Sequence, residues 1–177
     1  MLLSYTEICE LIEQGVIEGA EYESVNSASL DIHLGSKLKM EKFLFELMLI
    51  SLRDREPLSM CECSFPHTLA PGEFILTESR EIFHLPNNIS AEYKLKSSMA
   101  RIGLEHLNAG WCDAGWHGSV LTLELKNMTN FHYIELNKDD AIGQLVFFKH
   151  TPVPEDKSYA ARGRYNNDKT VTGAKSK

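Results

Sequence analysis

Long hydrophobic runs are missing from this sequence. No stretch reaches the roughly 18 consecutive apolar residues that a membrane-spanning helix needs. Residues 1–4 also lack the basic start and following apolar segment of a signal peptide. The 177 residues are 43% hydrophobic and 24% charged, which is ordinary for a water-soluble domain. We therefore expect one soluble, cytoplasmic domain with no membrane contact.

The sequence also lacks the closely spaced cysteine pairs of a zinc site and any excess of basic charge. The cysteines are Cys9, Cys61, Cys63 and Cys112, and the central and later histidines include His106, His117 and His132. No C-x-x-C pair occurs and the histidines are scattered, so the pattern favours reduced thiols over a structural zinc site. The formal net charge of −7 argues against binding to a nucleic-acid backbone, which attracts basic surfaces.

The N-terminal residues carry the pattern of one short helix. Ser4 and Glu7 have the spacing of a capping box. Apolar residues recur at helical spacing over 8–12, and Gly15 can end the helix. We expect this amphipathic helix to pack against the rest of the domain.

Most of the remaining chain alternates between short strand patterns and turn residues. The predicted strands span 28–35, 74–77, 89–95 and 142–148, and the predicted turns 71–72, 85–88 and 137–140. Gly35 is expected to close the first strand, and residues 39–52 are interpreted as strand and loop. Many short strands after one helix predict a mainly β fold, a distorted antiparallel barrel or jelly roll.

The composition changes after residue 154. Residues 155–177 are basic and hold few apolar side chains. We expect residues 1–154 to form a single β domain and 155–177 to form a basic tail. Such a segment is either mobile or a lid that orders over an anionic ligand in the active site.

Two cations and two hydroxyls lie close together in the middle of the chain, at Lys96, Ser97, Ser98 and Arg101. A point charge, a planar guanidinium and two hydroxyl donors suit a phosphate group. A solvated turn has the same composition, so this cluster alone is a weak signal.

A loop rich in glycine and tryptophan follows at 110–118. Asp113 lies where glycines let the backbone approach a ligand closely, although an Asx turn is the structural alternative. Trp111 and Trp116 can stack on a ligand or pack in the core.

Glu124 is the strongest catalytic candidate. Leu121, Leu123 and Leu125 surround it on a strand that is apolar on both faces. Burial there should raise the pKa of the carboxyl group toward neutrality, where it can both take and give a proton. An ion pair with Lys126 is the structural alternative.

Several segments, in order, resemble those of the dCTP deaminase branch of the dUTPase-like superfamily. Residues 27–35 are similar to its Ala-Ser-Val-Asp-Leu-Arg-Leu-Gly strand, and 96–104 to Arg-Ser-Ser-x-x-Arg-x-Gly-Leu. Residues 109–118 are similar to Ala-Gly-x-Ile-Asp-x-Gly-Phe-x-Gly, 121–125 to Thr-Leu-Glu-Leu, and 143–147 to the last core strand. The resemblance covers most of the chain and is far more specific than any single motif.

The resemblance implies a homotrimer of dUTPase-like barrels with active sites between subunits. It implies hydrolytic deamination of a magnesium-bound dCTP to dUTP and ammonia, which supplies thymidylate synthesis. No zinc is implied, and the H-x-E and P-C-x-x-C motifs of zinc deaminases are absent. By position, Glu124 would deprotonate the attacking water, Ser97 and the Ala109 carbonyl would hold that water, and Arg101 would steady it.

The resemblance also implies a substrate-binding set. In it Lys96 and Ser98 contact phosphate and Asp113 lies beside the deoxyribose. The full set is Lys96, Ser98, Asn108, Trp111, Asp113, Tyr159, Arg164 and Asp168.

The Ala-Gly-Trp and Asp-Ala-Gly sequences around Cys112 resemble family members that also hydrolyse dUTP to dUMP and pyrophosphate. A bifunctional enzyme is therefore an alternative. A plain dUTPase has less support, because the usual Tyr-Arg-Gly-Glu after the aspartate is absent.

Three departures from the family pattern bear on the site. Lys96 replaces an arginine and loses its bidentate geometry. One extra residue between Gly118 and Glu124 requires a bulge or a different loop path, because a shift by one would turn the side chains over. Asp168 stands where a glutamine is expected.

Two other classes of function stay open on the sequence. One is a catalytically silent nucleotide-binding homologue, which would bind dCTP without turnover. The other is a β-rich structural protein with no ligand, which would show no thermal shift with any deoxynucleotide and magnesium.

Overall fold

The computed structural model describes residues 1–47, 49–51, 53 and 56–175. The strands are β1 (Ile17–Glu18), β2 (Leu30–Glu41), β3 (Met60–Ser64), β4 (His67–Leu69), β5 (Phe74–His84), β6 (Ile89–Leu95), β7 (Leu104–Glu105), β8 (Trp111–Cys112), β9 (His117–Asn127), β10 (Ile134–Leu136) and β11 (Ala141–Lys149). The helices are α1 (Tyr5–Glu13), η1 (Tyr22–Ser24), α2 (Ser97–Arg101), η2 (Glu155–Lys157) and α3 (Tyr159–Arg162).

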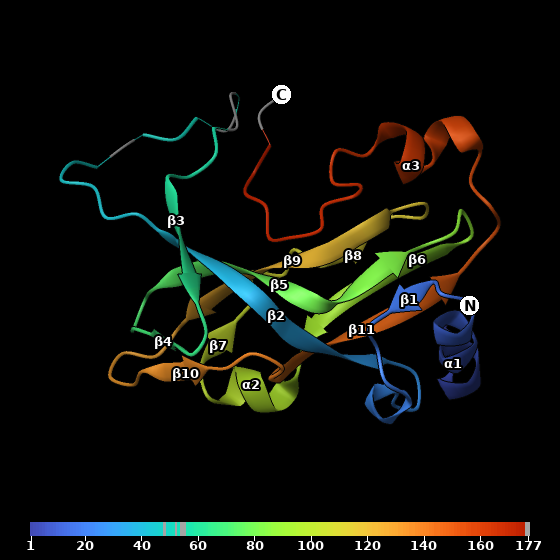
Figure 1. Ribbon diagram of the computed structural model, residues 1–177, viewed down its shortest axis with the longest axis horizontal. Coiled ribbons are helices and arrows are strands. Elements are labelled where there is room, and N and C mark those ends of the chain that lie inside the picture. Colours follow the sequence, from blue (N-terminus) through green and yellow to red (C-terminus); the bar gives the residue numbers. More distant parts are fainter. Residues whose placement is uncertain (48, 52, 54–55, 176–177) are drawn as a thin grey trace.

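One curled antiparallel sheet of nine strands dominates the molecule (Figure 1). Its main path runs β7-β9-β5-β2-β11-β6-β8, with β1 beside β5 and β3 beside β2, while β4 and β10 form a separate pair. The predicted mainly β, antiparallel, barrel-like fold is confirmed. None of the described helices is long and apolar enough to cross a membrane.

The predicted N-terminal helix is confirmed as α1. The Glu7 carboxylate accepts hydrogen bonds from the Ser4 backbone N–H at 3.0 Å and from the Ser4 hydroxyl at 3.1 Å. Ile8 and Leu11 are buried in the core, and Gly15 follows the helix with a φ of +69°. That left-handed conformation suits glycine and stops the helix.

The strand that begins at Leu30 does not end at Gly35, as the sequence predicted, but continues to Glu41. Its apolar side chains are buried as expected. The pairing of β2 with β5 is irregular between Leu34 and Leu38. A Cβ at Gly35 would meet the Cγ of Glu78 at 2.6 Å. The glycine therefore permits a close approach between strands and does not break the strand.

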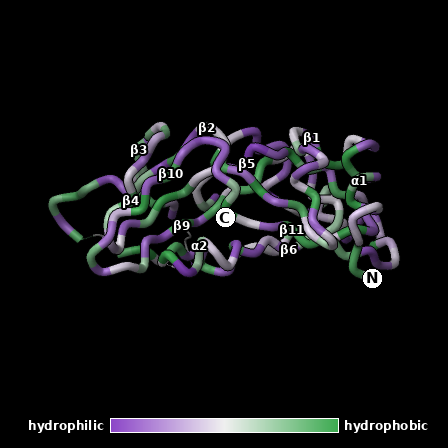
Figure 2. The backbone as a smooth tube through the Cα atoms, turned by 90° about the horizontal axis from the view of Figure 1, so that it is seen from below, coloured by the Kyte–Doolittle hydropathy of each residue, from purple (hydrophilic) through white to green (hydrophobic). Residues whose placement is uncertain are grey.

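The strand predicted at 89–95 forms with the same bounds as β6, and the other two form as longer versions, β5 and β11. The turn at 71–72 contains Gly72 at φ +79°, and the turn at 137–140 contains Asp139 at φ +66°. In the turn at 85–88, the Ile89 N–H donates to the Pro86 carbonyl at 3.2 Å. Hydrophobic and hydrophilic positions alternate along the strands, as expected for a sheet with one face in the core (Figure 2).

The region 39–52 ends β2 and then forms a loop, as predicted, although Met48 and Leu52 lie outside the described residues. This loop leads to β3 and reaches the edge of the molecule (Figure 1). Its side chains Phe43, Phe45 and Leu47 are 82%, 99% and 105% exposed. Such an apolar surface is unusual for an isolated soluble domain.

The C-terminal residues return along β9, on the same side of the sheet as that loop (Figure 1). The Val120 N–H donates to the Asp168 carbonyl at 3.0 Å, and the Asn167 N–H to the His117 carbonyl at 3.0 Å. Val171 is only 1% exposed. The described part of the tail is thus bound to its own chain along one strand.

Candidate functional site

A pocket of about 650 Å³ lies between β9, the loop before it, the loop before β3 and the C-terminal segment. This volume is within the roughly 300–1,000 Å³ typical of small-molecule sites. The pocket holds seven of the predicted site residues: Ala109, Trp111, Asp113, Glu124, Tyr159, Arg164 and Asp168.

Glu124 lies on β9, opposite Leu76 of β5. Leu123 and Leu125 on either side of it are buried. Burial raises the pKa of Glu124 from 4.5 to about 7, against a smaller lowering by a backbone hydrogen bond. Within the described part of the chain no ion pair joins it to Lys126, so the structural alternative has no support.

The extra residue before Glu124 is accommodated by a bulge. Phe83 pairs with Ser119 while His84 pairs with His117, so β9 has one residue more than β5 at Gly118. Gly118 adopts a φ of +66°. The pairing shifts again between Glu78 and Ile82, and beyond these two irregularities Glu124 lines the pocket.

A second cavity of about 10 Å³ adjoins the pocket, and Glu124 and Ala109 line both. This is about the volume that one water molecule occupies. Tyr93 and His106 lie on its wall. Burial raises the pKa of Tyr93, and the nearby charge of Glu124 raises it further, so the phenol stays neutral. Burial lowers the pKa of His106, which favours the neutral imidazole.

The loop at 109–113 forms one side of the pocket. The Gly110 carbonyl accepts a hydrogen bond from the Tyr93 N–H at 2.7 Å, which fixes the loop against β6. The Trp111 indole N–H donates to the Asp113 carboxylate at 2.9 Å. Trp111 is 60% exposed, whereas Trp116 is 7% exposed and packs against Phe83. Both tryptophans line the pocket, Trp111 as an exposed wall and Trp116 as a buried ring packed into the core beneath it.

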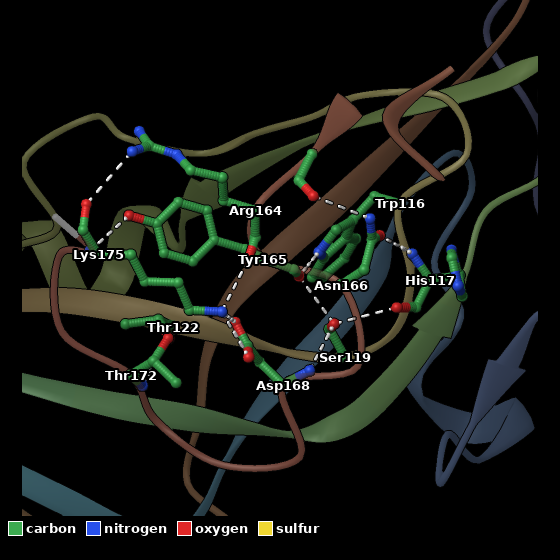
Figure 3. Close-up of polar contacts among 11 residues, drawn as sticks. Trp116, His117, Ser119, Thr122, Arg164, Tyr165, Asn166, Asp168, Thr172 and Lys175 are labelled. Atoms are coloured by element: carbon green, nitrogen blue, oxygen red, sulfur yellow. Dashed lines mark hydrogen bonds and ion pairs between the residues drawn. The ribbon is translucent and has the colours of Figure 1, made fainter. Parts of the chain in front are cut away.

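The C-terminal segment also lines the pocket, and Figure 3 shows its polar contacts. Lys175 donates to both carboxylate oxygens of Asp168 at 2.8 Å and to the Arg164 carbonyl at 2.7 Å. Its ammonium also lies 5.0 Å from the Tyr165 ring centre. Asp168, which stands where a glutamine was expected, is thus neutralised by Lys175. Lys175 was not singled out from the sequence, because nothing in a basic tail marks one lysine among several.

Five predicted site residues do not reach this pocket: Lys96, Ser97, Ser98, Arg101 and Asn108. Helix α2 lies on the opposite side of the sheet from the C-terminal segment (Figure 1). Ser97, Ser98 and Arg101 are exposed, as is Asn108, whose φ is +54°.

Lys96 forms an ion pair with Asp31. Burial alone would raise the pKa of Asp31, but its hydrogen bonds with Lys96 and Asn26 hold it below the usual value. In a single chain this lysine therefore links β2 to the start of α2.

Comparisons with known proteins point to one family. The family model described as dCTP deaminase-like matches residues 2–150. A protein of Nanoarchaeum equitans named "dCTP deaminase, dUMP-forming" is 33% identical over 98% of this chain and 96% of its own length. One of Aquifex aeolicus with the same name is 34% identical over 97% of this chain and 92% of its own length.

Solved structures show the same fold. The 2'-deoxycytidine 5'-triphosphate deaminase from Agrobacterium tumefaciens superposes with a TM-score of 0.65 at 22% identity, over 82% of this chain and 46% of that one. The dUTPase from Streptococcus mutans superposes with a TM-score of 0.51 at 15% identity, over 76% of this chain and 88% of that one. With a family model over most of its length and relatives over nearly all of it, this chain belongs to the dCTP deaminase-like family.

Proposed function

We propose that this protein deaminates dCTP by hydrolysis, with Glu124 as the general acid and base. The observation that carries the proposal is a carboxyl group with a pKa near 7 beside a water-sized cavity in the wall of a nucleotide-sized pocket. A base tuned near the working pH can both accept and return protons.

In this reaction the water in the small cavity adds to C4 of cytosine and gives a proton to Glu124. Glu124 passes that proton to N3. The remaining hydroxyl proton of the adduct then moves through Glu124 to the amino group, which leaves as ammonia, and the C4 carbonyl forms. The Ala109 carbonyl orients the water, and the low polarity around Glu124 keeps its two protonation states close in free energy.

Ser97 and Arg101 are proposed to reach the site from a second copy of the chain. Both are exposed and neither lines the pocket of its own chain, and their helix α2 lies across the sheet from the C-terminal segment (Figure 1). Arg101 has a fork of donors that suits charge developing on the water and its partners. A homotrimer with sites between subunits, which the family resemblance implies, would bring α2 of one chain to the pocket of the next.

Mg²⁺ is proposed to enter with the triphosphate. Among the described residues no three side chains of His, Cys, Asp or Glu gather as a metal site. The pocket does offer Asp113, whose carboxylate oxygens suit a hard cation held mainly by phosphate and water. Bound there, the ion would neutralise phosphate charge, while Arg164 and Lys175 supply the protein's own cations.

A dUMP-forming activity is the second candidate, because the relatives most like this chain over its whole length carry that name. Asp113 in the pocket is the residue proposed to help water attack the α-phosphate.

One incubation with dCTP and magnesium tests the reaction, with nucleotides and ammonia resolved by chromatography. Ammonia with dUTP supports deamination alone, and ammonia with dUMP and pyrophosphate supports both steps. Binding of dCTP without ammonia release would contradict the proposal and favour a silent nucleotide-binding protein.

A further inference from the structure

The C-terminal segment touches the pocket in two places. Arg164, Tyr165 and Asp168 line it before the chain turns away, and residues 172–175 line it again afterwards. Thr170 and Val171, between these two parts, do not line the pocket. Whatever holds these two residues therefore sets the position of the pocket-lining residues on both sides.

Glu78, on β5, holds them. One carboxylate oxygen, Oε2, accepts hydrogen bonds from the Thr170 hydroxyl at 2.7 Å and the Val171 N–H at 2.9 Å. The other, Oε1, accepts from the N–H and the hydroxyl of Ser36 on β2, both at 3.2 Å. One side chain thus connects the tail to the sheet.

This contact is built into the core of the molecule. Glu78 is 6% exposed and Val171 is 1% exposed. A carboxylate is stable at such a position only because several donors surround it. The absence of a side chain at Gly35 leaves the space that the Glu78 side chain needs, as the 2.6 Å distance to a hypothetical Cβ shows.

We propose that Glu78 is a positioning residue for the substrate site. It does not line the pocket, and it acts by fixing residues 168–175 over it. The expected change in KM for dCTP rests on the proposed function. The structural part of the inference, the attachment of the tail, stands without any substrate.

The first test compares Thr170→Val with Thr170→Ser. Valine keeps the shape of threonine and removes the hydroxyl donor, whereas serine keeps the donor. A hydrogen bond to a charged group is strong enough to change an equilibrium about tenfold. We expect Thr170→Val to raise KM for dCTP about tenfold with little change in kcat, and Thr170→Ser to restore the wild-type value.

The second test uses limited trypsin digestion without nucleotide, followed by mass spectrometry. Cleavage after Lys169, which lies in the attached segment, should become about tenfold faster in Thr170→Val and in Glu78→Gln. Gly35→Ala should also speed this cleavage, because the added Cβ on β2 would displace the Glu78 side chain that holds the tail.

The matched control is Glu73→Gln. The Glu73 carboxylate also accepts a backbone hydrogen bond, from the Ala70 N–H at 2.7 Å, but no hydrogen bond or ion pair joins it to the described tail residues 155–175. A merely structural role predicts that Glu73→Gln and Glu78→Gln lower the melting temperature alike and leave tail cleavage unchanged, and that result would overturn the inference. If wild type releases no ammonia, the proposed function fails, while the cleavage rates still decide the role of Glu78.

Discussion

The pocket at Glu124 and the helix α2 hold most of the site residues that the sequence singled out, and the fold treats them differently. The pocket is concave and is enclosed by a segment of its own chain. Helix α2 has no buried residue and presents Ser97 and Arg101 to solvent. A buried, surrounded carboxyl group acquires a shifted pKa, whereas exposed groups keep their ordinary chemistry until something covers them. The pocket therefore holds a group suited to acid–base catalysis within a single chain, whereas α2 does not.

The largest effect on activity is expected for a substitution of Glu124 in the pocket. Glu124→Gln should reduce ammonia release by about a thousandfold or more, because general acid–base catalysis is worth roughly 10²–10⁴. The control measurement is the free energy of unfolding of wild type and variant as a function of pH. The folded-state pKa lies above the ordinary 4.5, so ionisation costs wild type stability as pH rises from 4.5 to about 7. Above pH 7 the variant should be more stable, by up to about 3 kcal/mol. A lower melting temperature than wild type at pH 8 would argue against a buried carboxylate.

The next prediction tests whether Arg101 on α2 acts in the pocket of a second chain. Arg101→Ala should lower kcat by about a hundredfold, a typical loss for a group that stabilises developing charge. Each variant alone should have little activity, but after the two are unfolded and refolded together some sites should contain both native residues, and activity should rise above that of either variant. If the mixture stays as inactive as its components, Arg101 and Glu124 do not meet across chains.

The third effect concerns pH. Glu124 must be ionised to take a proton from water, so kcat/KM should fall about tenfold for each pH unit below 7 and level off above it. Rates at constant ionic strength, with melting temperatures recorded at each pH, check this. A profile that is flat from pH 5 to 8 would show that Glu124 is not the titrating base.

Sequence patterns predicted much of this architecture for physical reasons that are local. Alternation at β6 and capping at α1 depend on neighbouring residues alone, and both formed as predicted. Gly35 was misread because its role depends on Glu78, which is distant in sequence. The partners of Asp168 and Lys96 were likewise invisible, since Lys175 and Asp31 meet them only through the fold.

The smallest effect lies at the edge of the pocket. Lys175→Met should raise KM for dCTP about fivefold, because a partly exposed ion pair is worth up to about 1 kcal/mol and its loss leaves Asp168 facing the phosphates. Lys169→Met is the matched control, since Lys169 is exposed in the same segment and does not line the pocket. Equal KM values for the two variants would show that only total charge matters.

The exposed aromatic loop after β2 has a consequence for handling the protein. Phe43 and Phe45 are almost fully exposed in the single chain, and apolar surface of this kind drives self-association or adsorption. Dilute samples should therefore lose protein to vessel walls and show a specific activity that rises with concentration, and a solubilising tag is better placed away from this loop.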